Sequence, residues 1–210
     1  MSREAITPEA VDPDPRMTLV ARAISILGHP LLLTPVAGLG AWLAGGGGGG
    51  EALGIAVVGL LAVVLVMGYS YRRVRNGDWA HVDASGRAER RSLNRFLLLA
   101  FVAATIGGYA LQWPHQVLLG LLLSAAMVTA AMLAARWCKP SLHLAFAVLA
   151  AGLLWAVSTP ALVAGLLAAM AIAWSRLYLR RHVAADLWCG AVIGAAAATA
   201  FWSGMKQWPG

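Results

Sequence analysis

The stretch Ala52–Tyr71, ALGIAVVGLLAVVLVMGYSY, decides the fold. It contains no charged side chain, and as a helix rising ~1.5 Å per residue it spans the ~30 Å of hydrocarbon in a bilayer. Similar apolar runs recur along the chain, and we interpret seven as transmembrane helices: Ile24–Ala44, Ala52–Tyr71, Phe96–Trp113, Val117–Ala135, Leu142–Val157, Ala161–Tyr178 and Leu187–Trp202. Because several are short and one could be re-entrant, the sequence predicts an all-α, polytopic transmembrane helical bundle of six to seven spans.

The composition supports a membrane protein and argues against a nucleic-acid-binding protein. Of 210 residues, 60% are hydrophobic and only 12% are charged, and the mean hydropathy is +0.72. A net charge of +7 would favour nucleic-acid binding if the basic residues lay on a water-exposed face. Here they lie between apolar spans. Membrane lipids and a phosphorylated substrate are therefore the expected partners. We expect a disordered polar tail over residues 1–16, one bundle over 17–204 and a short tail over 205–210.

The distribution of basic residues predicts how the bundle is oriented. With seven spans, the N-terminus and all three polar connections lie on one side of the membrane. That side carries all but one of the 16 Lys and Arg residues: Arg3, Arg16, Arg22, Arg72, Arg73, Arg75, Arg87, Arg90, Arg91, Arg95, Arg136, Lys139, Arg176, Arg180 and Arg181. Only Lys206 is left for the opposite side. The positive-inside rule then places the polar connections in the cytoplasm.

The connection Ser175–Asp186 contains a candidate catalytic pair. His182 and Asp186 are four residues apart, so on a helix they share one face. There the carboxylate can bind one imidazole nitrogen and leave the other free to attack. The arginines of this segment, among them Arg176, offer fork-shaped donors to a phosphate. The alternative is a helix end where arginines extend to the headgroups and the His–Asp pair caps the interface.

A second polar segment, Lys139–His143, reads KPSLH. A helix that begins at a proline leaves backbone N–H groups for an anion, here beside a lysine, a hydroxyl and an imidazole. His143 could then protonate a leaving group. The alternative is a turn at the membrane surface, anchored in the headgroups by Lys139.

Taken together, these two segments resemble a known family. Lys-Pro-Ser-x-His followed by Ser-Arg-x5-His-x3-Asp resembles the second and third motifs of the type 2 phosphatidic acid phosphatase superfamily. The third motif matches at Ser175, Arg176, His182 and Asp186. The second motif departs from the family at Leu142, where the family has glycine. The resemblance runs from about Arg136 to Gly194.

The family's first motif, Lys-x6-Arg-Pro, is not found in this sequence. The segment Asn76–Arg91 stands in its place and looks like a variant used by smaller bacterial members, with an acidic residue followed by paired arginines. On this resemblance, Arg87 and Arg90 are expected to bind phosphate. The alternative is a basic loop that only sets the topology.

The resemblance implies a metal-independent phosphomonoesterase or pyrophosphatase that acts on a lipid phosphate in the bacterial cytoplasmic membrane, through a phosphohistidine. It implies that His182 is the nucleophile, that Asp186 orients it, and that His143 acts first as an acid and then as a base. The residues implied to bind the phosphate are Lys139, Ser141, Arg176, Arg87 and Arg90. Two other functions stay open: phosphotransfer to a lipid or sugar acceptor, and a non-catalytic lipid transporter or scaffold.

Three further expectations concern metals, cysteines and a histidine. The sequence has no carboxylate cluster or His-rich spacing suited to Mg²⁺ or Zn²⁺, so we expect no metal or other cofactor. Cys138 and Cys189 are too few for a disulfide framework, and we expect both to be packed as small apolar residues. His29, before Pro30, is expected to pack beside a kink in the first span. The sequence does not specify the oligomeric state.

Overall fold

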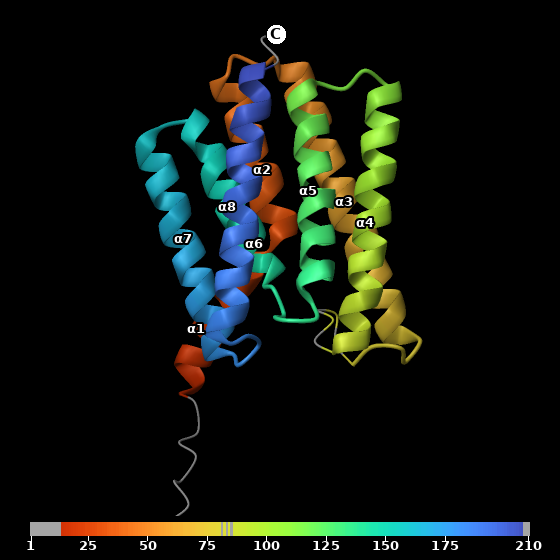
Figure 1. Ribbon diagram of the computed structural model, residues 1–210, viewed down its shortest axis with the longest axis vertical. Coiled ribbons are helices and arrows are strands. Elements are labelled where there is room, and N and C mark those ends of the chain that lie inside the picture. The colour runs from red at the N-terminus through yellow and green to blue at the C-terminus, as the bar shows by residue number, and fades with distance from the viewer. Residues whose placement is uncertain (1–13, 81, 83, 85, 208–210) are drawn as a thin grey trace, which may run out of the picture.

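The computed structural model describes residues 14–80, 82, 84 and 86–207, and all regular elements among these residues are helical. In chain order they are α1 (Pro15–Leu27), α2 (Pro30–Ala44), α3 (Gly49–Arg75), α4 (Arg87–Ala110), α5 (His115–Ala134), α6 (Leu142–Leu153), the short 3-10 helix η1 (Leu154–Ala156), α7 (Thr159–Tyr178) and α8 (Ala184–Gln207). Figure 1 shows the long helices running side by side along one axis. The predicted all-α bundle is confirmed.

The helices have the length and hydropathy of an integral membrane protein. Within the described part of the chain, five helices are long and apolar enough to cross a bilayer: α3, α4, α5, α7 and α8. The bent pair α1–α2 adds a sixth span if its two helices cross together. The seventh apolar run, Leu142–Ala156, is shorter than the others and reaches only ~22 Å at ~1.5 Å per residue.

The first predicted span, Ile24–Ala44, is not one straight helix. Helix α1 ends at Leu27 and α2 begins at Pro30, with a bend of 51° between them. Proline has no backbone N–H and clashes with the preceding turn, so it is suited to start a helix rather than continue one. His29 caps α2, because its Nδ1 accepts a 3.2 Å hydrogen bond from the backbone N–H of Leu31.

Helix α6 lies at the centre of the bundle. Eight of its 12 residues are buried, and it packs against α2, α7 and α8. Small residues permit this close packing: a methyl group added to Gly165 of α7 would lie 2.9 Å from the backbone of Ala151. At Gly190 of α8 an added methyl would lie 2.5 Å from the carbonyl oxygen of Ser141. The start of α8 is therefore held directly against the start of α6.

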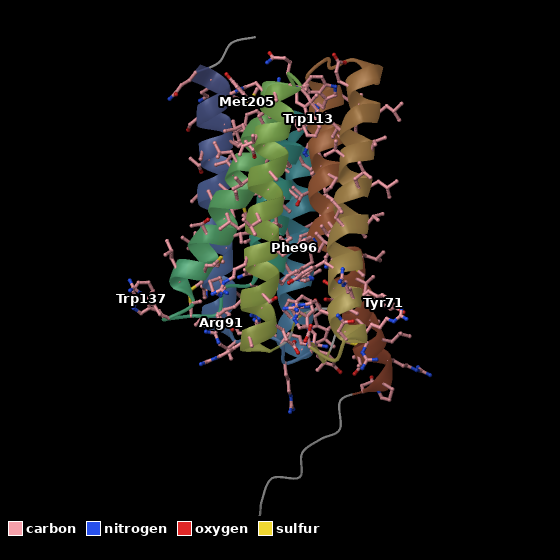
Figure 2. All side chains as sticks on the ribbon, turned by 90° about the vertical axis from the view of Figure 1, so that its right-hand side faces the viewer. Tyr71, Arg91, Phe96, Trp113, Trp137 and Met205 are labelled. Atoms are coloured by element: carbon pink, nitrogen blue, oxygen red, sulfur yellow. A yellow bond between two sulfur atoms is a disulfide. The ribbon has the colours of Figure 1, made fainter. Side chains whose placement is uncertain are left out.

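The polar connections gather at one end of the bundle. Figure 1 shows the α3–α4, α5–α6 and α7–α8 connections at its lower end, together with the start of α1. The α2–α3, α4–α5 and η1–α7 connections lie at the upper end. Figure 2 shows the same polarity in side chains, with Arg91 and Trp137 toward the lower end and Trp113 and Met205 near the upper one.

The helical region is longer than predicted at both ends. Helix α1 begins at Pro15, inside the predicted tail of residues 1–16, and the Asp14 side chain caps it by accepting a 2.8 Å hydrogen bond from the Arg16 N–H. Helix α8 continues to Gln207, inside the predicted tail of residues 205–210. The rest of the predicted N-terminal tail, residues 1–13, lies outside the described residues.

Candidate active site

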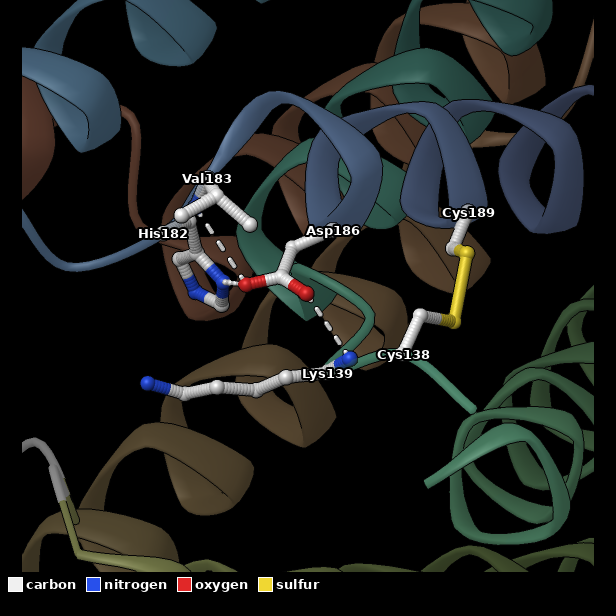
Figure 3. Close-up of a disulfide and its surroundings, with 6 residues drawn as sticks. All are labelled: Cys138, Lys139, His182, Val183, Asp186 and Cys189. Carbon is white, nitrogen blue, oxygen red and sulfur yellow. Dashed lines mark hydrogen bonds and ion pairs between the residues drawn. A yellow bond between two sulfur atoms is a disulfide. The ribbon is translucent and has the colours of Figure 1, made fainter. Parts of the chain in front are cut away.

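Asp186, in the first turn of α8, joins the two motif segments. Its Oδ1 accepts a 2.8 Å hydrogen bond from the backbone N–H of Lys139, and its Oδ2 lies 3.2 Å from Nδ1 of His182. The N–H of Val183 also donates to Oδ2, at 3.3 Å. The Asp186 carbonyl accepts a 3.1 Å bond from the N–H of Ser141. Figure 3 shows the carboxylate between the His182 ring and the backbone of Lys139.

His182 is held as a neutral imidazole. Burial and, next, the nearby charge of Arg176 lower the pKa of His182 to about 4, although the hydrogen bond with Asp186 acts in the opposite direction. With Nδ1 engaged by Asp186, the ring carries its proton on that nitrogen. Nε2 then has a lone pair at neutral pH, as a nucleophile requires. The predicted His–Asp pair is thus formed in this structure.

Lys139 lies where positive charges from three connections converge. Its Nζ donates a 3.1 Å hydrogen bond to the carbonyl of Arg181. Its pKa is lowered by burial and then by the charge of Arg90, whereas Asp186 raises it. Because Arg90 belongs to the variant first motif, all three polar segments meet here. Such a concentration of positive charge favours a bound anion.

Two more arginines border the same cavity. Arg176 is only 7% exposed, and its Nη1 donates a 2.9 Å hydrogen bond to Oγ of Ser25 on α1. Arg87 lines the cavity beside Arg90. Glu89, the acidic residue of the variant first motif, accepts hydrogen bonds from the N–H groups of Ala80 and Gly86, at 2.8 and 2.9 Å. It stabilises the connection and the start of α4.

His143 faces a histidine that sequence reasoning assigned to packing. The rings of His143 and His29 meet edge to face, with centroids 4.9 Å apart, and both residues line the cavity. Ser25, the partner of Arg176, was not identified from the sequence either. The only local signal for His29 is its position before Pro30, because a residue that precedes a helix-starting proline can cap the helix.

Ser141 occupies a different position from the other predicted phosphate-binding residues. It is fully buried, and its Oγ has no hydrogen-bond partner among the described residues. It lies against Gly190 and does not appear among the described residues that line the cavity, whereas Leu142 does. Its phosphate-binding role stays a prediction.

The two cysteines are not separately packed apolar residues, as expected from the sequence, but form a disulfide. Cys138 directly precedes Lys139, and Cys189 lies one turn after Asp186 on α8. Figure 3 shows the disulfide on one side of the Lys139 backbone and the His182–Asp186 pair on the other. The covalent bond therefore joins the same two segments that Asp186 joins by hydrogen bonds.

A cavity of about 1880 Å³ opens from these polar groups into the bundle. Its polar end is bordered by Arg87, Arg90, Lys139, His143, Arg176 and His182. From there it runs between α2 and α3 on one side and α4 and α5 on the other, past Val66 and Phe101, to Trp42 and Met205 near the far end. An apolar channel of this kind can hold a hydrocarbon chain whose headgroup reaches the cations.

The predicted absence of a metal stays a prediction. Over residues 14–80, 82, 84 and 86–207, no three His, Cys, Asp or Glu side chains are grouped so as to hold a metal ion. Among the described residues that line the cavity, Asp186 is the one with a carboxylate, and this group already binds the Lys139 N–H and His182.

Comparison with known proteins supports the family resemblance. The model of the PAP2 superfamily matches residues 134–209, which include Lys139, His143, Arg176, His182 and Asp186. No curated protein and no solved structure matches the chain. Members of the superfamily are generally phosphatases, which supports a hydrolase. The match over residues 134–209, which contain the second and third motif segments, supports the assignment of this region to the PAP2 superfamily.

Proposed function

We propose that the protein is a metal-independent lipid phosphate phosphatase that works through a phosphohistidine. The observation that carries the proposal is the position of Asp186, which binds Nδ1 of His182 and the backbone of Lys139 at once. One carboxylate thereby orients the nucleophile against the segment that bears the candidate acid, His143. The match to the PAP2 superfamily supports phosphatase chemistry at this site.

In the first step, Nε2 of His182 attacks phosphorus, and the bond between phosphorus and the lipid oxygen breaks. His143 gives a proton to the departing alkoxide, or to phosphate if the substrate is a pyrophosphate. Asp186 stabilises the charge that develops on the His182 ring. In the second step, His143 removes a proton from water, which attacks phosphorus and breaks the N–P bond. Inorganic phosphate leaves, and both histidines return to their starting states.

The cations at the polar end supply most of the remaining stabilisation in this proposal. Phosphoryl transfer spreads negative charge over the three non-bridging oxygens, so fixed positive groups lower the barrier. Lys139 of the α5–α6 connection, Arg90 of α4 and Arg176 of α7 border the same cavity. Arg87 borders that space as well. The hydrocarbon chain of the lipid would occupy the cavity between α2–α3 and α4–α5.

We further propose that the site faces the cytoplasm of a bacterial cell, in its cytoplasmic membrane. The proposal rests on charge, because Lys206 is the only described Lys or Arg at the opposite end of the bundle. The Cys138–Cys189 disulfide argues for the other orientation, since disulfides persist mainly in oxidising compartments. Accessibility labelling, described in the Discussion, decides between the two.

A phosphate-release assay tests the enzymatic proposal. The purified protein in detergent, with excess chelator, would be given phosphatidate, phosphatidylglycerophosphate, a polyprenyl phosphate and a polyprenyl pyrophosphate. We expect release from at least one of them by the wild type, and by a His115→Gln control at the far end of the bundle. We expect none from His182→Gln. Release that His182→Gln retains, or activity restored only by one divalent ion, would overturn the mechanism.

A further inference from the structure

Helix α1 and the break that follows it border the candidate active site, although they lie outside residues 134–209. Arg22, Ser25 and Ile26 line the cavity from α1, and His29 lines it from the break before α2. Because Ser25 and Ile26 follow Arg22 by three and four residues, these side chains lie on one face of the helix. A segment far from both motifs in the sequence therefore forms part of the wall around them.

Close packing against α7 holds the end of α1 in place. Figure 1 shows α1 beside the lower part of α7, and the two helices are in contact. A methyl group added to Gly28 would lie 2.5 Å from Cγ1 of Ile172, a buried residue of α7. Ile24 packs against the core cluster that contains Ile172. Arg176 follows Ile172 by four residues on the same face of α7, so this packing also places α1 beside Arg176.

Ser25 holds the guanidinium group of Arg176. Nη1 of Arg176 donates a 2.9 Å hydrogen bond to Oγ of Ser25, across 151 residues of sequence. An arginine side chain has many rotamers, and this bond favours one of them. The guanidinium group binds phosphate through a planar fork of donors, so its orientation decides how many of those bonds form. Ser25 can therefore influence a bound phosphate through Arg176.

The His29 ring is fixed in orientation and lies against the ring of His143. Because Nδ1 of His29 accepts the 3.2 Å hydrogen bond from the N–H of Leu31, the neutral ring carries its hydrogen on Nε2. Neither nitrogen then has a lone pair available to take up a proton, which argues against His29 as a base. The two rings are 4.9 Å apart at an angle of 84°, a favoured geometry for aromatic pairs. The contact restricts rotation of the His143 ring.

We propose that the end of α1 and the break before α2 form a further segment of the active site, in which Ser25 positions Arg176 and His29 positions His143. This proposal rests on the proposed function, because it takes Arg176 and His143 as groups that act on the substrate. The two positioning residues have different tasks. Ser25 affects the binding of the phosphoryl oxygens whatever the leaving group is, whereas His29 matters most when the leaving group needs a proton.

Binding of orthovanadate, which can mimic five-coordinate phosphorus, tests Ser25 by calorimetry on the purified protein. We expect Ser25→Ala to weaken binding by ~10-fold and Ser25→Thr, which keeps the hydroxyl, to recover most of the loss. In an Arg176→Met background, which retains the other cations, Ser25→Ala should add less than ~2-fold, because residues that act as a unit are not additive. The matched control is Thr18→Val, which removes a hydroxyl of α1 that donates to the Asp14 carbonyl at 3.0 Å. It should bind like the wild type.

The outcomes of this test separate the positioning role from the proposed function. Binding by Ser25→Ala that equals that of the wild type would overturn the role of Ser25. A loss of the same size in the Arg176→Met background would also overturn it, since Ser25 would then not act through Arg176. A wild type that does not bind orthovanadate would overturn the proposed phosphate site itself.

Pairs of substrates that share one lipid and differ in the leaving group test His29. Phosphatidate and a polyprenyl phosphate lose an alkoxide, whereas diacylglycerol pyrophosphate and the polyprenyl pyrophosphate lose a phosphate, which needs less help from an acid. We expect His29→Asn to lower kcat/KM by ~10-fold for the monophosphate of a pair and by less than ~3-fold for its pyrophosphate. Asparagine can still cap α2 by accepting from the N–H of Leu31. The control His115→Gln should change neither value.

The ratio of the two kcat/KM values within a pair decides the role of His29. Both values come from one preparation, so the ratio does not depend on the fraction of folded protein. Equal losses on both members of a pair, or no loss on either, would overturn the positioning of His143 by His29 and leave the phosphatase intact. Release by the wild type from no lipid phosphate at all would overturn the proposed function, and the positioning roles with it.

Discussion

The backbone N–H of Lys139 donates a 2.8 Å hydrogen bond to Oδ1 of Asp186, although 47 residues separate them in the sequence. This bond occupies one carboxylate oxygen and leaves the other for His182 and Val183. The carboxylate is therefore both an orienting group for the imidazole and a structural link to the segment that leads to His143. Changes at Asp186 should affect both tasks.

We first predict that Asp186→Asn lowers kcat for phosphate release by ~10²–10⁴-fold. An asparagine amide has one acceptor oxygen and cannot serve the Lys139 N–H and Nδ1–H of His182 together. The histidine then loses its orientation and its favoured tautomer. Steady-state kinetics on the purified variant, with His115→Gln as control, would measure the loss. A change of less than ~3-fold would remove Asp186 from the mechanism.

His143→Ala should accumulate a phosphorylated enzyme when the leaving group is a good one. Attack by His182 survives in this variant, whereas activation of water does not. Brief incubation with a ³²P-labelled substrate, followed by a quench that preserves the acid-labile N–P bond, would reveal the label on the protein. The double variant His143→Ala, His182→Ala serves as control and should carry none. Label retained by the double variant, or none on His143→Ala, would contradict covalent catalysis at His182.

The low pKa of His182 predicts that the enzyme retains its nucleophile in mildly acidic solution. The folded-state pKa, about 4, lies below the ordinary value of 6.5, so the reactive neutral ring is lost only as the pH falls through about 4. A profile of kcat/KM against pH should therefore show no loss near pH 6.5 that belongs to this residue. The second ionisation of the phosphate substrate, with a pKa of ~6, produces a separate sloping limb in the same pH profile. A methylphosphonate monoester, which has no second ionisation, should lack that limb and keep the enzyme limb.

Breaking the Cys138–Cys189 disulfide should loosen the junction between the two motif segments. The bond closes a loop of 51 residues in sequence, for which chain entropy gives an upper bound of about 4 kcal/mol in water. We expect Cys138→Ala, Cys189→Ala to melt at a lower temperature than the wild type and to have a lower kcat. The wild type should approach the same values after reduction with dithiothreitol, while the variant should not respond. A wild type that is insensitive to the reductant, with all its thiols free, would show that the bond is not formed.

Topology can be measured with single cysteines in the Cys138→Ala, Cys189→Ala background. Asn76→Cys lies in the α3–α4 connection at the end that carries the site, and Gly47→Cys lies in the α2–α3 connection at the other end. With a membrane-impermeant thiol reagent on intact cells, the positive-inside rule predicts labelling at position 47 and protection at position 76. The reverse pattern would place the site and the disulfide outside the cytoplasm, and lysed cells should label both positions.

The sequence by itself determined the class of fold and the local catalytic pattern. Hydropathy is a local property, so the apolar runs predicted the helical bundle, and four-residue spacing placed His182 and Asp186 on neighbouring turns. Each crossing of the membrane reverses the side on which the chain emerges. The predicted order of spans therefore also placed the three polar connections at one end of the bundle, as Figure 1 shows.

Only the tertiary structure decided how the segments meet. It brought Arg90 to Lys139, His29 to His143 and Cys138 to Cys189, and it opened the cavity between α2–α3 and α4–α5. These contacts depend on which helix faces approach each other. That choice is set by packing at small residues such as Gly190 and by the break before Pro30, which act between segments far apart in the chain. A sequence pattern within one segment carries no information about the distance in space between that segment and another.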